Sequence, residues 1–433
     1  MTVEEHTRLL NMGLSSIREL EVERGILASG RDEMYGCIFG RDSLITSLSL
    51  LSSYEKNKDP YVLGLVRKIL MNLATLQGRS VNIKSGEEPG KCIHEFRPDR
   101  HEHLTARAEH PWYVYPDGAM RNYDTVDATP LFLMAVHAYH RAGGDADMVE
   151  ALLPSVEMAL DWILKYGDSN GDGFIDYRFD AARKYGGLTT QSWMDSHDSV
   201  FLDEGEDPAY PIAPVEVQAY AYAALRMWAE YFRTHGDEER AARCESQAQG
   251  LKHSFNEKFV LFEESSFSLA FGIDGNGRAM KSPRSSMGHV LWAAYWNREG
   301  TPECILNDDL IPRLVERLLQ TDLFVPSAGI RTLSMLSKRF NANSYHNGSI
   351  WPHDTGMIAE GFSNFGFAEE ADRVRRALIQ AYMHFETPIE LFAYDDTYAE
   401  YVSESGQRAC RNQAWSAAAL ISALGAIAPG TQG

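Results

Sequence analysis

Apolar residues recur at spacings of three and four along most of this chain, which is the period of an amphipathic α-helix. The clearest face carries Phe367, Ala371, Val374, Leu378, Ala381 and Phe385. We expect Pro154 to lie near the start of the fifth helix or to kink it. The pattern predicts twelve helices with few strands between them, over residues 3–25, 42–54, 61–76, 127–142, 146–166, 214–234, 237–257, 286–297, 305–320, 352–365, 367–386 and 412–427.

The lengths of the connections predict how these helices are arranged. From the second helix on, the helices come in pairs, such as the second with the third and the fourth with the fifth, and roughly one to eight residues join the two members of each pair. The loops that lead from one pair to the next, and to the twelfth helix, are roughly 25 to 50 residues long. Short links produce antiparallel neighbours, so the long loops gather at one end. We predict an all-α fold, an (α/α)6 toroid made by residues 1–433 as a single domain, with its functional site at the mouth.

Composition narrows the classes of partner. With 44% hydrophobic residues the chain can bury a large core, and its net charge of −20 disfavours nucleic acid and anionic membranes as partners. The five cysteines show neither CxxC pairs nor metal-ligand spacing. Because no signal peptide and no apolar run of about 18 residues is recognisable, we expect a cytoplasmic protein outside the membrane, and leave its oligomeric state open.

One long loop concentrates residues suited to glycoside hydrolysis. Trp193, Asp195 and His197 lie in it, and Glu216 follows at the start of an alanine-rich helix. A carboxylic acid with a raised pKa can protonate a leaving oxygen, and an indole can stack on a sugar. Asp195 could equally cap a turn, and Glu216 could simply suit the helix dipole.

The other long loops carry matching chemistry. Asp42 could cap the second helix, or Arg41 and Asp42 could grip sugar hydroxyls as donor and acceptor. Four tryptophans on the long-loop side are candidate sugar platforms: Trp112, Trp193, Trp351 and Trp415. Further polar candidates in these loops are Asp127, His346 and Glu390.

The sequence predicts neither a metal nor a cofactor. The gap between His346 and His353 matches no common zinc pattern, and no Gly-x-Ser-x-Gly elbow or phosphate-cradling glycine loop is present. Residues 168–176 resemble the first half of an EF-hand loop, but Phe179 stands where the bidentate Glu belongs. We favour a polar turn over a truncated calcium loop there.

Nine motifs in order resemble the amylo-α-1,6-glucosidase domain of glycogen-debranching enzymes, over about residues 35–425. They are Phe39-Gly-Arg-Asp-Ser, Val126-Asp-Ala-Thr-Pro, Gly171-Asp-Gly-Phe-Ile-Asp-Tyr, Ser192-Trp-Met-Asp, Pro214-Val-Glu, Gly329-Ile-Arg-Thr, Tyr345-His-Asn-Gly-Ser-Ile-Trp-Pro-His-Asp, Glu390-Leu-Phe and Gln413-Ala-Trp-Ser.

The resemblance implies an (α/α)6 barrel and an inverting, exo-acting α-glycosidase that releases glucose from α-linked, chiefly α-1,6-linked, carbohydrates. It implies that Asp195 is the general acid and Glu390 the general base. The family's positions that grip the sugar correspond here to Arg41, Asp42, Asp127, Trp193, Glu216, His346, Trp351 and Trp415. Glu216 is the main rival for either catalytic role.

The chain also departs from the family pattern. Residues 401–411 replace a Pro-Val-Ser-Cys-like segment, and neither a glucanotransferase domain nor an N-terminal β-rich domain is recognisable. A small α-glucoside or oligosaccharide is therefore weighed equally with branched glycogen. The alternatives are a hydrolase of glucosylglycerate or mannosylglycerate, an (α/α)6 sugar epimerase or isomerase, which would need histidines for proton transfer, and a non-catalytic sugar-binding barrel.

Overall fold

The protein is mostly helical, as the sequence predicts. The computed structural model describes residues 1–203, 205–263 and 266–427, and helices account for 46% of it. The helices are α1 (Val3–Leu20), α2 (Gly40–Asn57), α3 (Pro60–Thr75), α4 (Glu102–Thr105), α5 (Ala128–Arg141), α6 (Ala146–Lys165), α7 (Val215–Thr234), α8 (Glu238–Lys258), α9 (His289–Trp292), α10 (Ile311–Leu318), α11 (Pro352–Asn364), α12 (Ala368–Phe385) and α13 (Ala414–Ala426).

Short antiparallel strands join the long loops to one another. They form small sheets of two or three strands, so they contribute little to the core. The strands are β1 (Glu21–Val22), β2 (Gly25–Ile26), β3 (Ile38–Phe39), β4 (Glu95–Arg97), β5 (Met120–Asn122), β6 (Ala213–Pro214), β7 (Val260–Glu263), β8 (Ser266–Leu269), β9 (Gly272–Ile273), β10 (Tyr295–Trp296), β11 (Pro302–Glu303), β12 (Phe324–Val325), β13 (Gly329–Ile330), β14 (Phe392–Asp395) and β15 (Thr397–Glu400).

Six helices form a closed inner ring. In the order α2, α5, α7, α9, α11 and α13, each helix contacts the next, and α13 contacts α2. Long unbroken stretches of these helices are buried, for example residues 128–137 in α5 and 215–225 in α7. A helix that is buried all round must be surrounded by other elements, which explains why the alanine-rich α7 and α13 belong to this ring.

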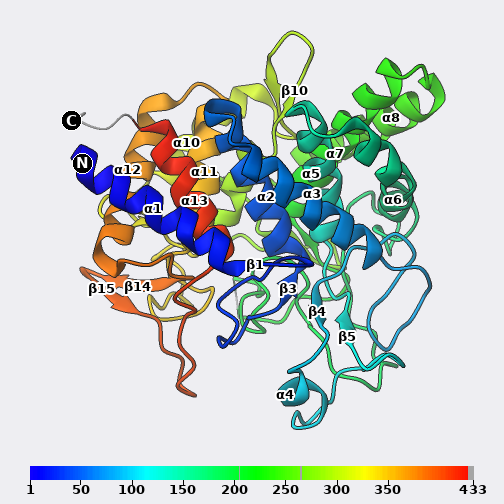
Figure 1. Cartoon of the computed structure of the whole chain (residues 1–433), viewed down its shortest axis with the longest axis horizontal. Helices are drawn as coiled ribbons and strands as arrows, with labels where there is room; N and C mark the ends of the chain where they lie inside the picture. Colours follow the sequence, from blue (N-terminus) through cyan, green and yellow to red (C-terminus); the bar gives the residue numbers. More distant parts are fainter. Residues whose placement is uncertain (204, 264–265, 428–433) are drawn as a thin grey trace.

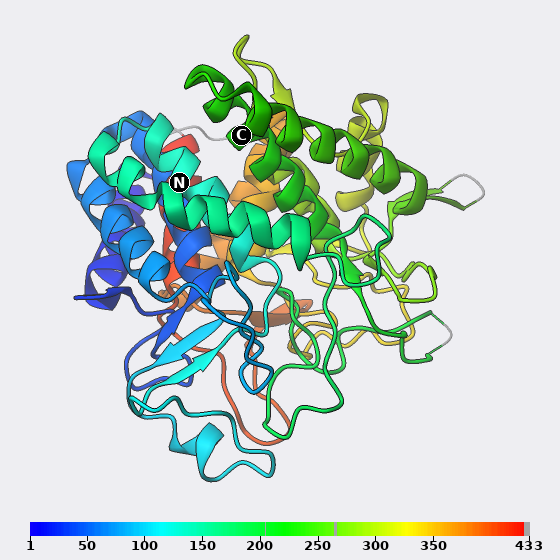
Figure 2. The same cartoon turned by 90° about the vertical axis from the view of Figure 1, so that its right-hand side faces the viewer.

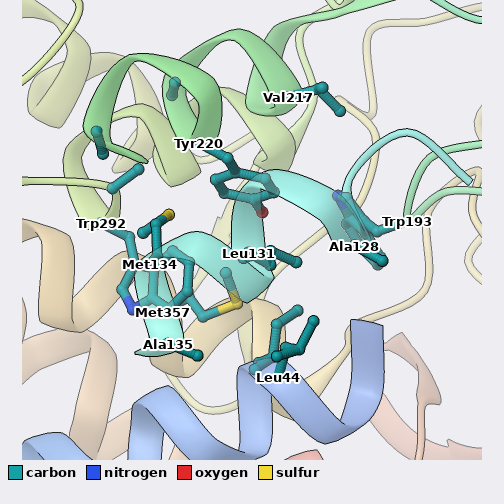
Figure 3. Packing of buried hydrophobic residues seen from close by; sticks show 14 of the residues in the cluster. Leu44, Ala128, Leu131, Met134, Ala135, Trp193, Val217, Tyr220, Trp292 and Met357 are labelled. Carbon is teal, nitrogen blue, oxygen red and sulfur yellow. The ribbon is translucent and has the colours of Figure 1, made fainter. Parts of the chain in front are cut away.

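The interior of the ring is filled by side chains. Figure 3 shows Leu44, Met134, Tyr220, Trp292 and Met357 around a common centre, and they come from α2, α5, α7, α9 and α11. All five are buried. The ring is therefore a packed core rather than a pore.

The remaining long helices cover the ring from outside. Contacts place α1 on α13, α3 on α2 and α5, α6 on α5, α8 on α7, and α12 on α11 and α13. Their apolar residues follow the period of one helical face, as Ala241, Cys244, Ala248, Leu251 and Phe255 do in α8. Among the described residues, no helix is long and apolar enough to cross a bilayer.

The loops and short strands gather at one side of the molecule. In Figures 1 and 2, the helices other than α4 occupy the upper part of the molecule, and most of the long connections lie below them. The three-stranded sheet β3-β4-β5 lies on this side, and it pairs Ile38 with Phe96 and Phe96 with Arg121. This side also holds the cavity described below.

Several predicted elements differ from the observed ones. The first helix ends at Leu20 rather than at residue 25, because β1 and β2 pair across a turn in which Gly25 has a φ of 121°. The helix predicted over 286–297 is a 3-10 turn, Ser285–Gly288, followed by the single turn of α9. Pro154 lies inside α6 rather than near its start.

Two helical glycines predict opposite effects on stability. A Cβ atom at Gly40 would lie 2.0 Å from the carbonyl oxygen of Ile93, whereas a Cβ atom at Gly64 would meet nothing within 4 Å. Gly40→Ala should lower the free energy of unfolding by about 1–3 kcal/mol through overpacking. Gly64→Ala should raise it by about 0.5–1 kcal/mol. Denaturant unfolding measures the free energy of unfolding of both variants. If Gly40→Ala were as stable as Gly64→Ala, the close packing of the start of α2 against Ile93 would be contradicted.

Candidate active site

The first turns of the five longer inner helices, α2, α5, α7, α11 and α13, meet at one place. Arg41 and Asp42 lie at the start of α2, Asp127 precedes α5, Glu216 lies in α7 and Trp415 in α13. The positive ends of the helix dipoles therefore surround this point, and they favour carboxylates. The meeting point explains why residues separated by hundreds of positions can form one site.

Polar and ring contacts connect neighbouring helices around this point. They are Arg41 Nη1 to Asp127 Oδ2 at 2.9 Å, Tyr220 Oη to His289 Nδ1 at 2.6 Å, His289 Nε2 to Asp354 Oδ1 at 2.7 Å, the stacked rings of His353 and Trp415 at 3.7 Å, and Gln413 Nε2 to Asp42 Oδ1 at 3.3 Å.

A small cavity opens at this end of the ring. Eight of the ten site residues predicted from the sequence line it, together with four others. The predicted ones are Arg41, Asp42, Trp193, Asp195, His346, Trp351, Glu390 and Trp415, and the additional ones are Tyr35, Phe39, Tyr345 and Gln413. The structure thus brings the predicted acid and base into the same cavity, although their roles stay predictions.

Arg41 is the central cation of the site. Its side chain is 5% exposed, and it forms ion pairs with Asp127 through Nη1 and with Asp195 through Nη2, at 2.9 and 2.7 Å. Each of these carboxylates, together with that of Asp42, raises the pKa of Arg41 against the effect of burial. A single guanidinium therefore offsets part of the charge of three carboxyl groups.

Burial shifts the ionisation of Asp195 towards the protonated form. It raises the pKa of Asp195 to about 6, although the charge and hydrogen bond of Arg41 act in the opposite direction. The Asp195 side chain is 23% exposed, so it can reach a ligand in the cavity. These are the properties that a general acid requires.

Glu390 is held by two hydrogen bonds. The backbone N–H of Cys410 donates to Oε2 at 2.7 Å, and the Tyr345 hydroxyl donates to Oε1. Burial raises the pKa of Glu390 to about 7, while the Tyr345 hydrogen bond lowers it. The Tyr35 and Tyr345 hydroxyls lie 3.1 Å apart, and because the single Tyr345 hydrogen goes to Glu390, Tyr35 is the donor between the two phenols, so both belong to the environment of the proposed base.

Asp42 carries a third shifted carboxyl group. Burial raises its pKa to about 7, Arg41 lowers it, and the charge of Asp195 raises it further. Asp42 in turn raises the pKa of Glu390. Asp42 therefore interacts electrostatically with both proposed catalytic carboxyls.

The aromatic side chains form a rigid wall. Trp193 donates its indole N–H to Ser286 Oγ at 3.0 Å and stacks on His289 at 5.7 Å. His346 stacks on Trp351 at 5.0 Å. Because Trp193 is only 1% exposed, at most part of its ring can face a sugar.

Several polar atoms at the cavity are buried without a partner among the described residues. They are Arg41 Nε, His346 Nε2, Gln413 Oε1 and Trp415 Nε1. Buried polar groups normally have hydrogen-bond partners, so these positions favour a ligand or ordered water. The mixture of donors and acceptors suits a ligand rich in hydroxyl groups.

Three sequence candidates lie outside the cavity lining. Asp127 is fully buried behind Arg41, and Glu216 is fully buried in α7. Neither Glu216 oxygen meets hydrogen-bond geometry with a described residue. Burial raises the pKa of Glu216 to about 8, although its own backbone amide and the Ser192 side chain act in the opposite direction. Trp112 does not line the cavity either.

Four of the cavity-lining residues are not among the site residues that the sequence predicts. Tyr345 and Gln413 lie in motifs that were noted for their neighbours, so their position was a usable signal. Phe39 likewise opens the Phe39-Gly-Arg-Asp-Ser motif, whereas Tyr35 comes from the loop before β3 and reaches the cavity through the fold. No local pattern distinguishes Tyr35 from the other tyrosines.

Residues 168–176 form a turn stabilised by hydrogen bonds. Asp168 accepts the backbone N–H groups of Gly171 and Gly173, and Asp176 accepts that of Ser169. In the part of the chain that the structure describes, no group of three or more His, Cys, Asp or Glu side chains is arranged to hold a metal ion.

Several solved structures with the same fold are glycosidases. A mannosylglycerate hydrolase from Thermus thermophilus in complex with glucose has a TM-score of 0.62 at 14% identity, over 95% of this chain and 99% of that one. A glycosidase variant in complex with glucose has a TM-score of 0.59 at 14% identity, over 99% and 100% of the two chains. No curated protein sequence matches this chain significantly.

A family match specifies the relationship. Residues 113–422 match the family described as Amylo-alpha-1,6-glucosidase. This stretch includes Asp195, Glu390 and most of the cavity-lining residues, and it extends over more than half of the chain. The chain therefore belongs to the amylo-α-1,6-glucosidase family of glycoside hydrolases.

Proposed function

We propose that this protein is an inverting, exo-acting α-glycosidase that releases glucose from α-linked glucosides or oligosaccharides. The observation that carries the proposal is that Asp195 and Glu390 line one cavity with hydrogen-bonding groups that lack partners among the described residues. Inverting hydrolysis needs one carboxylic acid and one carboxylate, with a water molecule between the base and the sugar. Because the chain belongs to the amylo-α-1,6-glucosidase family, we propose α-1,6 linkages as the bonds that it cleaves.

In the proposed reaction, Asp195 donates its proton to the glycosidic oxygen as the bond to the sugar breaks. Glu390 accepts a proton from the water that attacks the opposite face of the ring. Arg41 then stabilises the Asp195 carboxylate through the 2.7 Å contact. The hydrogen bond from Cys410 fixes one Glu390 oxygen and limits the orientations of the other.

The order of the two pKa values affects how much enzyme is productive. The pKa of Glu390 is about 7 and that of Asp195 about 6 in the empty site. A single proton shared by the pair then favours Glu390, and only a fraction of the singly protonated enzyme carries it on Asp195. Substrate that approaches Asp195 and displaces its contact with Arg41 would raise this fraction.

We also propose that the inner ring and its outer helices form an (α/α)6 toroid. The closed sequence of contacts from α2 to α13 and back supports this arrangement. The first turns of α2 and α13 form part of the floor of the cavity. A floor of this kind favours cleavage at a chain end over cleavage within a polymer.

The second candidate function is hydrolysis of glucosylglycerate or mannosylglycerate. It is favoured by the shared fold and nearly equal length of the mannosylglycerate hydrolase. Against it, Arg41 is the only cationic side chain among the described residues lining the cavity, and both its terminal nitrogens are engaged by carboxylates. We therefore favour a neutral leaving group, and relative rates on isomaltose, panose, glycogen limit dextrin and glucosylglycerate would decide.

Removing either proposed catalytic carboxyl should abolish most activity. Asp195→Asn and Glu390→Gln should each lower kcat by about 10²–10⁴-fold, because each loses proton transfer. Proton NMR of the anomeric signals should show β-glucose as the first product of the wild-type enzyme. Asp180→Asn, in the same long loop, serves as control. Near-wild-type turnover by either site variant would refute the assignment.

The pH profile of kcat/KM should be a narrow bell with limbs near 6 and 7, because Glu390 must be ionised and Asp195 protonated. Tyr345→Phe removes a hydrogen bond that lowers the pKa of Glu390, so the upper limb should move to higher pH. Tyr61→Phe, which removes the phenol hydrogen bond to Glu21 on the outer surface, should leave both limbs in place. If the upper limb of the Tyr345→Phe profile did not move, that limb would not report the ionisation of Glu390.

Glu216→Gln tests the rival carboxyl. Because the folded pKa of Glu216 is about 8 against an ordinary value of 4.5, wild-type stability should fall relative to the variant as pH rises between these values. The difference should grow by roughly 1.4 kcal/mol for each pH unit and level off above the folded pKa. The variant should retain most of its kcat. A loss as large as that of Asp195→Asn would instead make Glu216 catalytic.

A further inference from the structure

Arg284 is a buried cation that the reaction scheme does not use. It precedes the 3-10 turn Ser285–Gly288 and is 2% exposed. Among the described residues it forms no ion pair with a carboxylate, and burial lowers its pKa to about 9. Burying an unpaired charge costs stability, so the residue requires an explanation other than the stability of the core.

The guanidinium is held entirely by neutral groups. Nη1 donates to the carbonyl oxygen of His346 at 2.8 Å, and Nη2 donates to the carbonyl oxygen of Ser199 at 2.5 Å and to Asn347 Oδ1 at 2.8 Å. Its plane packs on Phe201 and Phe271, with the central carbon 5.0 and 4.6 Å from the ring centroids. A lysine could not provide this planar fork.

These contacts join two loops that are far apart in the chain. On one side, Ser199 Oγ donates to the carbonyl oxygens of Met194 and Ser196 at 2.5 and 2.7 Å, which closes a turn around Asp195. On the other side, the loop continues directly to Tyr345, whose hydroxyl donates to Glu390. Arg284 thus connects the turn that holds the proposed acid, Asp195, to the loop whose Tyr345 holds the proposed base, Glu390.

A second connection between the loops depends on the same junction. Ser196 N–H donates to His346 Nδ1 at 3.3 Å, which leaves the hydrogen of a neutral His346 on Nε2. That nitrogen is buried without a described partner, and His346 lines the cavity. Burial and the charges of Arg284 and Arg41 lower the pKa of His346, so it stays neutral beside Asp195 and His353.

We propose that Arg284 is a positioning residue that fixes the loop carrying Asp195 against the loop carrying Tyr345 and His346. It thereby holds the proposed acid and base at the distance and orientation that the reaction needs. This proposal rests on the proposed glycosidase function. Displacement of a reacting group by about 1 Å can cost 10²-fold in rate, so a junction remote from the sugar can control turnover.

Arg284→Ala and Arg284→Lys test the proposal on the full chain. Arg284→Ala should lower kcat by about 100-fold, while KM and the affinity for glucose change much less, because the loss is one of alignment. Added guanidinium ion should restore at least about tenfold of the lost kcat in Arg284→Ala by refilling the site. Arg284→Lys keeps the charge but not the fork, so it should lose kcat without a large loss of melting temperature.

Arg317→Ala is the matched control, because Arg317 in α10 is also buried, but it pairs with Asp322 and does not line the cavity. It should lose thermal stability and keep its kcat per folded molecule. If Arg284→Lys and Arg284→Ala kept wild-type kcat, or lost it only in proportion to unfolding and without rescue by guanidinium, the positioning role would be refuted. Failure of the wild-type enzyme to cleave any α-glucoside would instead refute the proposed function and would be seen before any variant is compared.

Discussion

The site depends on one guanidinium that attracts three carboxyl groups where the first turns of the longer inner helices meet. These helices direct their first turns, and so the positive ends of their dipoles, to the same place. Asp42, Asp127 and Asp195 accumulate there, and Arg41 interacts with all three. Without Arg41, these carboxylates would have to take up protons or repel one another. This balance keeps Asp195 ionisable near neutrality despite its burial, which a general acid needs.

The proposed acid and base themselves do not lie on the inner helices. Asp195 lies in a long loop, and Glu390 lies between α12 and β14. Each is therefore fixed by side chains from other loops: Arg41 for Asp195, and Tyr345 with the Cys410 amide for Glu390. Arg284 connects these supports through carbonyl groups, at the cost of a buried unpaired charge. Sites often retain groups that reduce stability when those groups organise function.

The wall of the cavity combines rigid rings with polar atoms. The stacked pairs His346 with Trp351 and His353 with Trp415 restrict the rings to single orientations. Several polar atoms here remain without described partners: His346 Nε2, both ring nitrogens of His353, Trp415 Nε1, Arg41 Nε and Gln413 Oε1. A ligand that supplies both hydrogen-bond donors and acceptors would satisfy them without large rearrangement. This complementarity favours a sugar over an apolar or strongly charged ligand.

The sequence by itself determined the helical class, the approximate position of each long helix, and the loops that hold Asp195 and Glu390. Periodicity reports which face of a helix is apolar, and ordered motifs report side chains whose chemistry is local. Only the tertiary structure decided that Asp127 and Glu216 lie behind the cavity, that Tyr35 and Tyr345 face it, and that the helix expected over 286–297 shrinks to α9. Burial depth, pKa and loop-to-loop contacts such as those of Arg284 depend on neighbours that are distant in sequence. Local spacing carries no information about those neighbours.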